Sequence, residues 1–446
     1  MILAKTGLQL TELGSKRSKI IDPEMAEVRM PGSSSVERKK CTMKRSGSAS
    51  RASLTLSIIQ LEHSIDQIDR PIAEITTLAL DKLQCSTPSG QAFNPRLRQK
   101  VEKSVIRFLR DQDRWTALTS LLLKSLAFYR SRDSVAARAE KEDEDNPSAG
   151  VESLKIGDEV LPVVDLPRTE YNRPYLPRLG REPTNVHVSA ARKGKAVDEN
   201  FNSMMNVSHQ YPWVCMVQKG TGLPPMLGLD LVTFDARLSK YTPTIEDFLK
   251  SFVASFTPWE WDRISHCRKR PSWTSGSWST RRRSEDSKLR EFYLRWSMKE
   301  AYTKALGMGM HIEFNQFETK LCGVDIDANN NYSQGCEEGI WEQIMAQEVQ
   351  TNSNKGNGHR QLSVTGKVQY TDSPTPLESW EFIFIPLGGG DGVDGSTMDH
   401  AHNSCACICR GPLLKDDPCI SAKNDPVNVQ TLTLADLLLL HGCNPL

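Results

Sequence analysis

The chain has 446 residues, with 56 lysines and arginines against 55 aspartates and glutamates, and a formal net charge of +1 at pH 7. This length allows two domains of ordinary size plus tails, and the balanced charge argues against a general nucleic-acid binder. We expect no membrane span and no secretory leader, and the 11 scattered cysteines favour a reduced, cytoplasmic protein.

The first half of the chain divides into a polar extension and a helical and strand-forming region. Residues 1–52 are rich in serine, lysine and arginine without an apolar period, so we predict disorder there. Apolar residues recur at helical spacing over 98–130, with a break near Asp111. An acidic segment over 140–150 predicts a linker. Short β-rich runs predict strands over 159–164, 213–218 and 226–232.

The second half begins with a predicted helical block over 245–265 and a polar insertion over 267–286. The clearest helix is predicted over 291–306, because the run lacks glycine and proline and ends at Gly307, where a C-cap glycine belongs. The remaining predictions are a variable loop over 322–360, strands over 380–385 and 404–409, a glycine-rich connection over 388–395 and a short helix over 432–440. Helices and strands alternate without βαβ crossovers, which predicts an α+β fold.

The helix over 291–306 carries the strongest chemical signal. Trp296, Glu300 and Lys304 are spaced i, i+4, i+8 and share one helical face. One interpretation is a solvated Glu300–Lys304 pair that supports the helix by about 0.3–0.5 kcal/mol. The other is that Glu300 binds a hard cation such as Mg²⁺ while Lys304 contacts ligand phosphates.

Three polar segments precede this helix. Asp230, at the end of an apolar strand beside a glycine, either binds a metal or starts a turn. The run 206–210 can donate hydrogen bonds to phosphate oxygens, or can form a polar turn. Arg168 and Arg173 either contact a phosphate or lie on a surface loop. A later zinc site is set aside, because its candidate ligands lack the Cys-x-x-Cys spacing; they are Cys405, Cys407, Cys409, His400 and His402.

In this order the four segments resemble the motifs of eukaryotic, Sfp-type 4′-phosphopantetheinyl transferases. The family pattern runs from Arg…Gly-Lys/Arg-Pro through Asn-hydrophobic-Ser-His and Gly-hydrophobic-Asp to Trp-x-x-Lys-Glu-Ala/Ser-x-x-Lys-x-x-Gly. The chain reads Arg168…Asn172-Arg173-Pro174, Asn206-Val207-Ser208-His209, Gly228-Leu229-Asp230 and Trp296-Ser297-Met298-Lys299-Glu300-Ala301-Tyr302-Thr303-Lys304-Ala305-Leu306-Gly307. The resemblance covers 101–309 and continues weakly to 404–409 and 432–437. It departs at Val232, where bacterial relatives carry an acid, at Asn172, where glycine is usual, and before Val101.

The resemblance implies roles for individual residues. Asp230 and Glu300 would hold Mg²⁺, or Mn²⁺ in its place. Phosphate and nucleotide contacts on coenzyme A would come from Lys103, Arg168, Arg173, Asn206, Ser208, His209, Lys299 and Lys304. The implied catalytic residues are Asp230, Glu300 and Lys304, with Glu300, or a metal-bound water that it orients, taking the proton of the acceptor serine.

The resemblance also implies a fold and a reaction. The fold would be two similar α+β halves forming an intramolecular pseudo-dimer, over 53–222 and 223–412, followed by a tail over 413–446. The reaction would transfer the 4′-phosphopantetheine arm of coenzyme A to a carrier-protein serine, releasing adenosine 3′,5′-bisphosphate, as a holo-acyl-carrier-protein synthase does.

Partners follow from the same resemblance. They would be apo acyl carrier protein, the carrier domains of polyketide and nonribosomal peptide synthetases, and the aminoadipate reductase of lysine biosynthesis, served by a monomer. We expect neither nucleic acid nor a membrane as partner. The alternative is a catalytically impaired carrier-protein or nucleotide-binding module of the same fold, which the missing acid at Val232 keeps open.

Overall fold

The fold is given by a computed structural model. It describes residues 54–85, 95–142, 161–166, 168, 174, 176, 205–219, 226–234, 243–265, 280–322, 362–372, 379–387, 404–413 and 427–445. The predicted disordered extension, the glycine-rich connection and most of the loop over 322–360 lie outside these residues.

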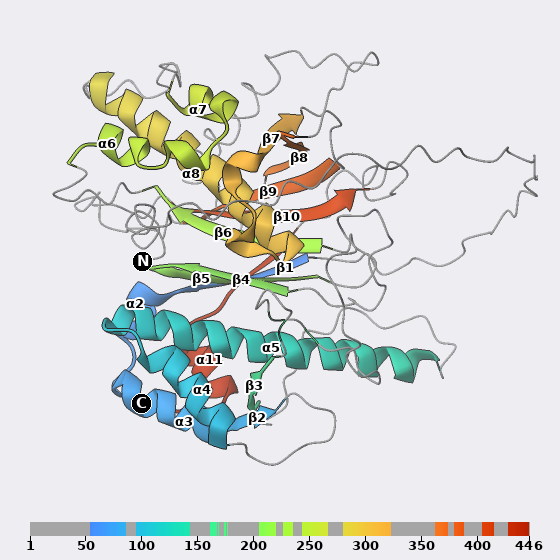
Figure 1. The fold of residues 1–446 in the computed structure, drawn as a ribbon. Helices are drawn as coiled ribbons and strands as arrows, with labels where there is room; N and C mark the ends of the chain where they lie inside the picture. The colour runs from blue at the N-terminus through green and yellow to red at the C-terminus, as the bar shows by residue number, and fades with distance from the viewer. Residues whose placement is uncertain are drawn as a thin grey trace, which may run out of the picture. The chain divides into compact units, whose positions relative to one another are not determined.

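The first part of the fold is a four-stranded sheet with the order β11-β1-β5-β4 (Figure 1). Its antiparallel strands are β1 (Leu54–Gln60), β5 (Trp213–Lys219) and β4 (Met205–Gln210), while β11 (Asn428–Thr431) pairs with β1 in parallel. The chain therefore has a central opening strand in the region before Val101, where the family motifs are not recognisable. The segment 206–210 is a strand, so its alternative as a polar turn is wrong.

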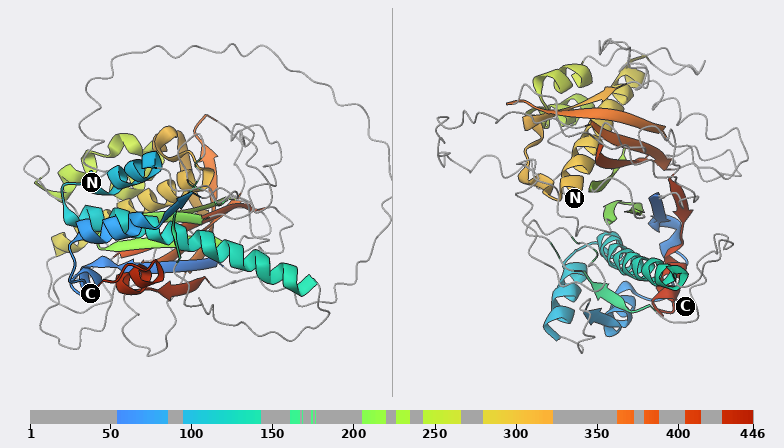
Figure 2. Two further views of the ribbon diagram at one scale, coloured as in Figure 1. Left: turned by 90° about the horizontal axis from the view of Figure 1, so that it is seen from below. Right: turned by 90° about the vertical axis from the view of Figure 1, so that its right-hand side faces the viewer.

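Helices cover one face of this sheet. They are α2 (Leu61–Ile65), α3 (Ile72–Asp81), α4 (Pro95–Ile106), α5 (Asp111–Glu142) and α11 (Leu434–Leu440), and the short strands β2 (Leu83–Cys85) and β3 (Val163–Asp165) pair beside them. The predicted break near Asp111 is confirmed, but α5 continues to Glu142, into the segment predicted as a linker. Figure 2 shows α5 from two further directions.

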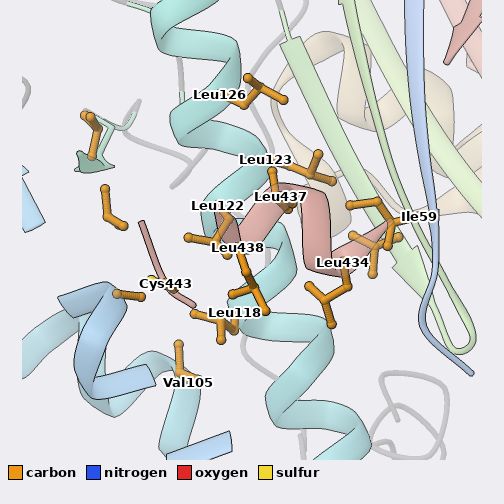
Figure 3. Packing of buried hydrophobic residues seen from close by; sticks show 14 of the residues in the cluster. Ile59, Val105, Leu118, Leu122, Leu123, Leu126, Leu434, Leu437, Leu438 and Cys443 are labelled. Carbon is orange, nitrogen blue, oxygen red and sulfur yellow. The ribbon is translucent and has the colours of Figure 1, made fainter. Parts of the chain in front are cut away.

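The core between α5 and the sheet follows from a leucine stripe. Leu118, Leu122 and Leu126 are spaced four residues apart, so they share one helical face, and each is at most 1% exposed. The stripe meets leucines of α11 from the far end of the sequence, as Figure 3 shows; these are Leu434, Leu437 and Leu438.

The residues predicted as a C-terminal tail thus complete the first sheet and its core. Backbone and side-chain contacts fasten this segment: Lys82 Nζ donates to the Gly442 carbonyl oxygen at 2.7 Å, and the His441 ring lies 2.7 Å from the Leu161 carbonyl oxygen. Residues 427–445 are therefore part of the same folded unit as β1 and α5.

The second part of the fold is an antiparallel five-stranded sheet with the order β6-β10-β9-β8-β7. Its strands are β6 (Met226–Thr233), β10 (Ser404–Leu413), β9 (Ser379–Leu387), β8 (Leu362–Tyr370) and β7 (Phe317–Cys322). The predicted strands over 226–232, 380–385 and 404–409 are confirmed, whereas β7 and β8 of this sheet were not predicted.

Helix α8 (Thr280–Leu306) packs on this sheet against β6 and β10. It starts before the predicted 291, so residues 280–286 are helical and not part of a polar insertion. Its predicted end is confirmed: Gly307 has φ 75°, and the Met308 amide donates to the Thr303 carbonyl oxygen at 3.1 Å. The predicted block over 245–265 forms α6 (Ile245–Lys250), the 3₁₀ turn η2 (Val253–Ser255) and α7 (Pro258–Ser265), and after α8 come the turns η3 (Gly309–His311) and η4 (Phe314–Gln316).

The two sheets share a core made by alternate residues of their strands. Leucines of β6 and β1 are among its members; they are Leu227, Leu229, Leu231, Leu54 and Leu56. Because side chains alternate along a strand, the intervening residues of β6 face α8 and those of β1 face α5. The predicted α+β class is confirmed. No helix in the described ranges has the length and apolar character that a membrane span needs.

Candidate functional site

Strand β6 brings a carboxylate directly against α8. Gly228 and Asp230 are two residues apart and share one face of the strand, while Leu229 points into the core between the sheets. A Cβ atom built on Gly228 would lie 1.9 Å from the Ala301 carbonyl oxygen, so only glycine permits this close approach of helix and strand. The glycine therefore allows the carboxylate of Asp230 to reach side chains of α8.

Three elements meet at Asp230. Lys304 Nζ, on α8, lies 2.6 Å from Asp230 Oδ1 and donates to Ser208 Oγ, on β4, at 3.0 Å. The Ser208 hydroxyl in turn donates to Asp230 Oδ1 at 3.2 Å. Residues separated by as many as 96 positions in the sequence thus form one hydrogen-bonded cluster. Asp230 lies within β6, so its alternative as a turn residue is wrong.

Glu300 adds a second carboxylate one helical turn before Lys304. Burial, together with the negative charge of Asp230 and against the opposing effect of Lys304, raises the pKa of Glu300 to about 7. Burial also raises the pKa of Asp230, although the ion pair with Lys304 opposes this shift. Burial lowers the pKa of Lys304, but Asp230 and Glu300 outweigh it and leave the pKa raised. Two carboxylates facing one ammonium leave a site that a cation would stabilise.

The carboxylate pair fits Mg²⁺ or Mn²⁺ that is shared with a phosphorylated ligand. Both side chains offer hard oxygen donors, and Mg²⁺ is commonly held by one or two carboxylates plus phosphate oxygens. Within the described ranges no group of three or more His, Cys, Asp and Glu side chains could hold a metal. Val232, on the same face of β6, is 2% exposed and offers no ligand. A cation at this site would therefore need oxygens of the ligand.

His209 and Lys124 lie beside this cluster. Because β4 alternates, His209 points to the opposite face from Ser208, toward the side covered by α5. Loss of hydration and the positive charges of Lys304 and Lys124 lower the pKa of His209. Burial and the charge of Arg168 lower the pKa of Lys124 to about 8, although Asp165 acts in the opposite direction. The positive charges of Lys304, Lys124 and Arg168 that act on these two groups indicate a place where an anion would be stabilised.

Lys124 was missed in the sequence because it lies inside an apolar stretch of α5. In the described part of the chain its ammonium has no hydrogen bond or ion pair of its own, and the side chain is partly buried. A single lysine after Leu121-Leu122-Leu123 is the only local signal, and it does not distinguish a site residue from a surface one.

The predicted phosphate contact at Lys299 is wrong. Its side chain is fully buried, and its ammonium pairs with Glu260 Oε2 at 2.8 Å and donates to the carbonyl oxygens of Phe314 and Phe317. Glu260 also accepts from the Thr319 amide. The helical turn explains the difference, since adjacent residues on a helix point about 100° apart and Lys299 faces the protein interior.

The other residues predicted to contact coenzyme A show no hydrogen bond or ion pair with the Asp230 cluster among the described residues. Asn206 is buried on the same strand as Ser208 and two residues before it. Arg168 is exposed and forms an isolated β-bridge with Pro174, while Arg173 lies outside the described residues. Lys103 is exposed on α4, and no contact with the Asp230 cluster is found within the described ranges. Their roles as coenzyme contacts remain predictions.

The three alternating cysteines lie on β10 beside this site. Cys407 pairs directly with Asp230 in the β10–β6 register, so both side chains point to the same face. Burial, with smaller contributions from Cys405 and Cys409, raises the pKa of Cys407 well above its ordinary value. A protonated, buried thiol is a poor metal ligand and packs as a small apolar group. His400 and His402 lie outside the described residues.

Comparison with known proteins supports the resemblance that was drawn from the sequence motifs. Residues 226–333, which include β6 and α8, match the 4′-phosphopantetheinyl transferase superfamily. A phosphopantetheinyl transferase from Thraustochytrium sp. is 31% identical over 133 residues, covering 29% of this chain and 40% of that protein. The L-aminoadipate-semialdehyde dehydrogenase-phosphopantetheinyl transferases of Mus musculus and Homo sapiens are 26% and 27% identical, each over 34% of this chain and 44% of their own length.

The chain thus spans less than half the length of the curated relatives that it matches. The matched segment contains Asp230, Glu300 and Lys304, the residues that meet in the structure. The resemblance drawn from the motifs is confirmed: residues 226–333 match the 4′-phosphopantetheinyl transferase superfamily, and the chain is similar to eukaryotic phosphopantetheinyl transferases.

Proposed function

We propose that the protein transfers the 4′-phosphopantetheine arm of coenzyme A to a serine of apo carrier proteins and releases adenosine 3′,5′-bisphosphate. The observation that carries this proposal is the meeting of Asp230, Glu300, Lys304 and Ser208 in one cluster, within a segment that matches the transferase superfamily. The arrangement provides hard oxygen donors beside cations, which is what a pyrophosphate and its metal need.

Asp230 and Glu300 would hold Mg²⁺, which when bound neutralises charge on the pyrophosphate of coenzyme A. Lys304 stabilises the negative charge of the departing bisphosphate. Lys124 and Arg168 supply further positive charge for the nucleotide phosphates, and the neutral His209 ring can donate a hydrogen bond to them. These residues position the substrate and stabilise charge, which is the main contribution a protein makes to phosphoryl transfer.

The bond changes are those of a single displacement at phosphorus. The serine oxygen forms a bond to the β-phosphorus, the bond to the bridging oxygen breaks, and adenosine 3′,5′-bisphosphate leaves with that oxygen. We assign the serine proton to Glu300, because Lys304 and Ser208 already engage Asp230 while no hydrogen bond to the Glu300 side chain is found among the described residues.

We further propose that the two sheets with their long helices are the halves of an intramolecular pseudo-dimer, in a monomeric, cytoplasmic protein. Each sheet packs on the other by one face and carries a long helix, α5 or α8, on its other face. Carrier substrates would include acyl, polyketide and peptidyl carriers and an aminoadipate-semialdehyde dehydrogenase, the last suggested by the names of the mammalian relatives.

The test is incubation of the full chain with coenzyme A, Mg²⁺ and apo carrier proteins, followed by intact-mass measurement. We expect the carrier to gain the mass of one phosphopantetheine group, to remain unmodified in EDTA, and to be modified again when Mg²⁺ is restored. Full transfer in EDTA would contradict the metal assignment. Absence of transfer to every carrier tested would favour the impaired binding module.

A further inference from the structure

The turn between α4 and α5 exposes two large apolar side chains to solvent. Leu109 is 94% exposed and Ile106 is 46% exposed, whereas Val105 on the same helix is buried. Among the described residues five large hydrophobic side chains are exposed, and two of these five lie in this one turn. A single exposed leucine is ordinary, but a pair with cations around it is typical of an interaction surface.

Three cations lie close to these two residues in the sequence. Lys103, on the last turn of α4, and Arg107 and Arg110, in the turn that follows it, are all exposed. Within the described ranges none of the three forms an ion pair. Other basic residues of the same two helices do, for example Arg98 with Asp81 at 2.6 Å and Arg114 with Asp111 at 2.8 Å. The three charges are therefore available to a partner.

Contacts within the turn and buried side chains on either side of it fix its backbone conformation. Arg114 Nε donates to the Phe108 carbonyl oxygen at 2.8 Å, and the Arg107 guanidinium lies 4.8 Å from the centre of the Phe108 ring. Val105 and Trp115, on either side of the turn, are at most 5% exposed. A surface whose backbone is already fixed loses little conformational entropy when a partner binds.

The turn also lies within reach of the proposed site. Helix α5 runs from Asp111 past Lys124, and at about 1.5 Å per residue these two positions are roughly 20 Å apart along the helix. A protein interface of standard size buries about 800 Å² per partner, which corresponds to a patch roughly 30 Å across. One globular partner could therefore contact the turn while presenting a serine near Lys124 and Lys304.

We propose that Lys103, Ile106, Arg107, Leu109 and Arg110, here called the α4–α5 corner, dock an acidic, amphipathic helical face of the carrier-protein substrate. The proposal rests on the proposed function. Leu109 would enter an apolar groove of the partner, and the cations would pair with acidic residues at its rim, the usual anatomy of a protein interface. A phosphorylated small molecule alone would not explain an exposed leucine between the cations.

The test uses Leu109→Ser and Arg110→Glu in the full chain, with the KM for apo carrier and the KM for coenzyme A measured separately. We expect both variants to raise the KM for carrier by on the order of tenfold, while kcat at saturating carrier, the KM for coenzyme A and the melting temperature stay unchanged. Arg110→Lys keeps the charge and should restore binding. Leu439→Ser, which changes a 55% exposed leucine on α11, is the matched control and should behave as the wild type.

A second measurement separates this proposal from the proposed function. Binding of apo carrier to the wild type and to Leu109→Ser is measured by calorimetry without coenzyme A. Weaker binding by the variant supports the corner even if the wild type transfers nothing. An unchanged KM for carrier in both variants overturns the corner and leaves the transferase function standing. A raised KM for coenzyme A with an unchanged KM for carrier also overturns it, and assigns these cations to phosphate binding.

Discussion

At the scale of single residues, Lys299 and Glu300 are adjacent on α8 but have different surroundings. Lys299 belongs to a buried ion pair with Glu260, whose two side chains are both fully buried. Glu300 faces Asp230 and Lys304. A conservative change at each position therefore tests a different property: stability at Lys299, and charge at the candidate site at Glu300.

For Lys299→Met we expect a loss of about 3–5 kcal/mol in the free energy of unfolding, because the change leaves the Glu260 carboxylate buried without its counter-ion. Lys304→Met should cost less stability, since the Lys304 side chain is 27% exposed and Asp230, whose pKa is already raised by burial, can take up a proton when its counter-ion is lost. The change should nevertheless abolish most transfer. Urea denaturation and the intact-mass assay measure the two quantities. A stable Lys299→Met protein that has lost only transfer would return Lys299 to the phosphate site.

For Glu300→Gln the stability is expected to depend on pH in the metal-free protein. The pKa of Glu300 is raised to about 7 from its ordinary 4.5, so the folded state binds this proton more tightly than the unfolded state. The wild type therefore loses stability as pH rises between these two values. In EDTA we expect the variant to be the more stable protein at about pH 8, by on the order of 1–3 kcal/mol, and equal to the wild type near pH 4.

The same variant should transfer on the order of 10²–10³ times more slowly, because it removes charge from the site of phosphoryl transfer. Addition of Mg²⁺ with coenzyme A should raise the melting temperature of the wild type and leave that of Glu300→Gln nearly unchanged. A variant that transfers at the wild-type rate would rule out this site.

At the scale of elements, the contact between β6 and α8 determines whether the candidate site exists. For Gly228→Ala we expect a loss of at least about 1–3 kcal/mol in stability, because the new methyl group would meet the backbone of α8 at Ala301 and Ala305. The helix must then move away from β6, and a shift of about 1 Å can lower the transfer rate by on the order of 10².

Gly309→Ala is the contrasting change. No atom lies within 4 Å of its added Cβ, and only the positive φ of 52° opposes the substitution. We expect a loss of about 1 kcal/mol, with transfer preserved. Thermal melting and the mass assay compare the two variants. If Gly228→Ala were as stable and active as Gly309→Ala, the close approach of α8 to β6 would not matter for the site.

At the scale of the whole molecule, the two ends of the chain should differ in what they contribute. Deletion of residues 427–446 would remove β11 and three buried leucines of α11. Each buried leucine contributes about 1.5–3 kcal/mol, so the sum approaches the total stability of about 5–15 kcal/mol that a domain has. We expect the shortened protein to be insoluble or unfolded by circular dichroism.

Deletion of residues 1–50 should instead leave folding and transfer nearly unchanged, because that segment has the composition of a disordered extension. Loss of solubility in this second protein would show that the extension has a structural role. Wild-type melting after deletion of 427–446 would show that α11 does not support the core.

The sequence by itself determined the local elements and the chemistry of the main motif. Repeating leucines specify α5. The run without glycine or proline specifies the last part of α8, and Gly307 specifies where that helix ends. Glu300 and Lys304 share a face because a helix has 3.6 residues per turn. These features depend on neighbours within a few positions. The same holds for Gly228 and Asp230, whose spacing of two places them on one face of a strand.

Only the tertiary structure decided which distant segments meet. The pairing of β11 with β1, the union of Ser208, Asp230 and Lys304, and the burial of Lys299 against Glu260 each join residues from separate elements. The position of Lys124 beside His209 and Arg168 is of the same kind. A side chain's partner across the fold depends on how sheets and helices pack, and a short sequence pattern carries no information about that packing.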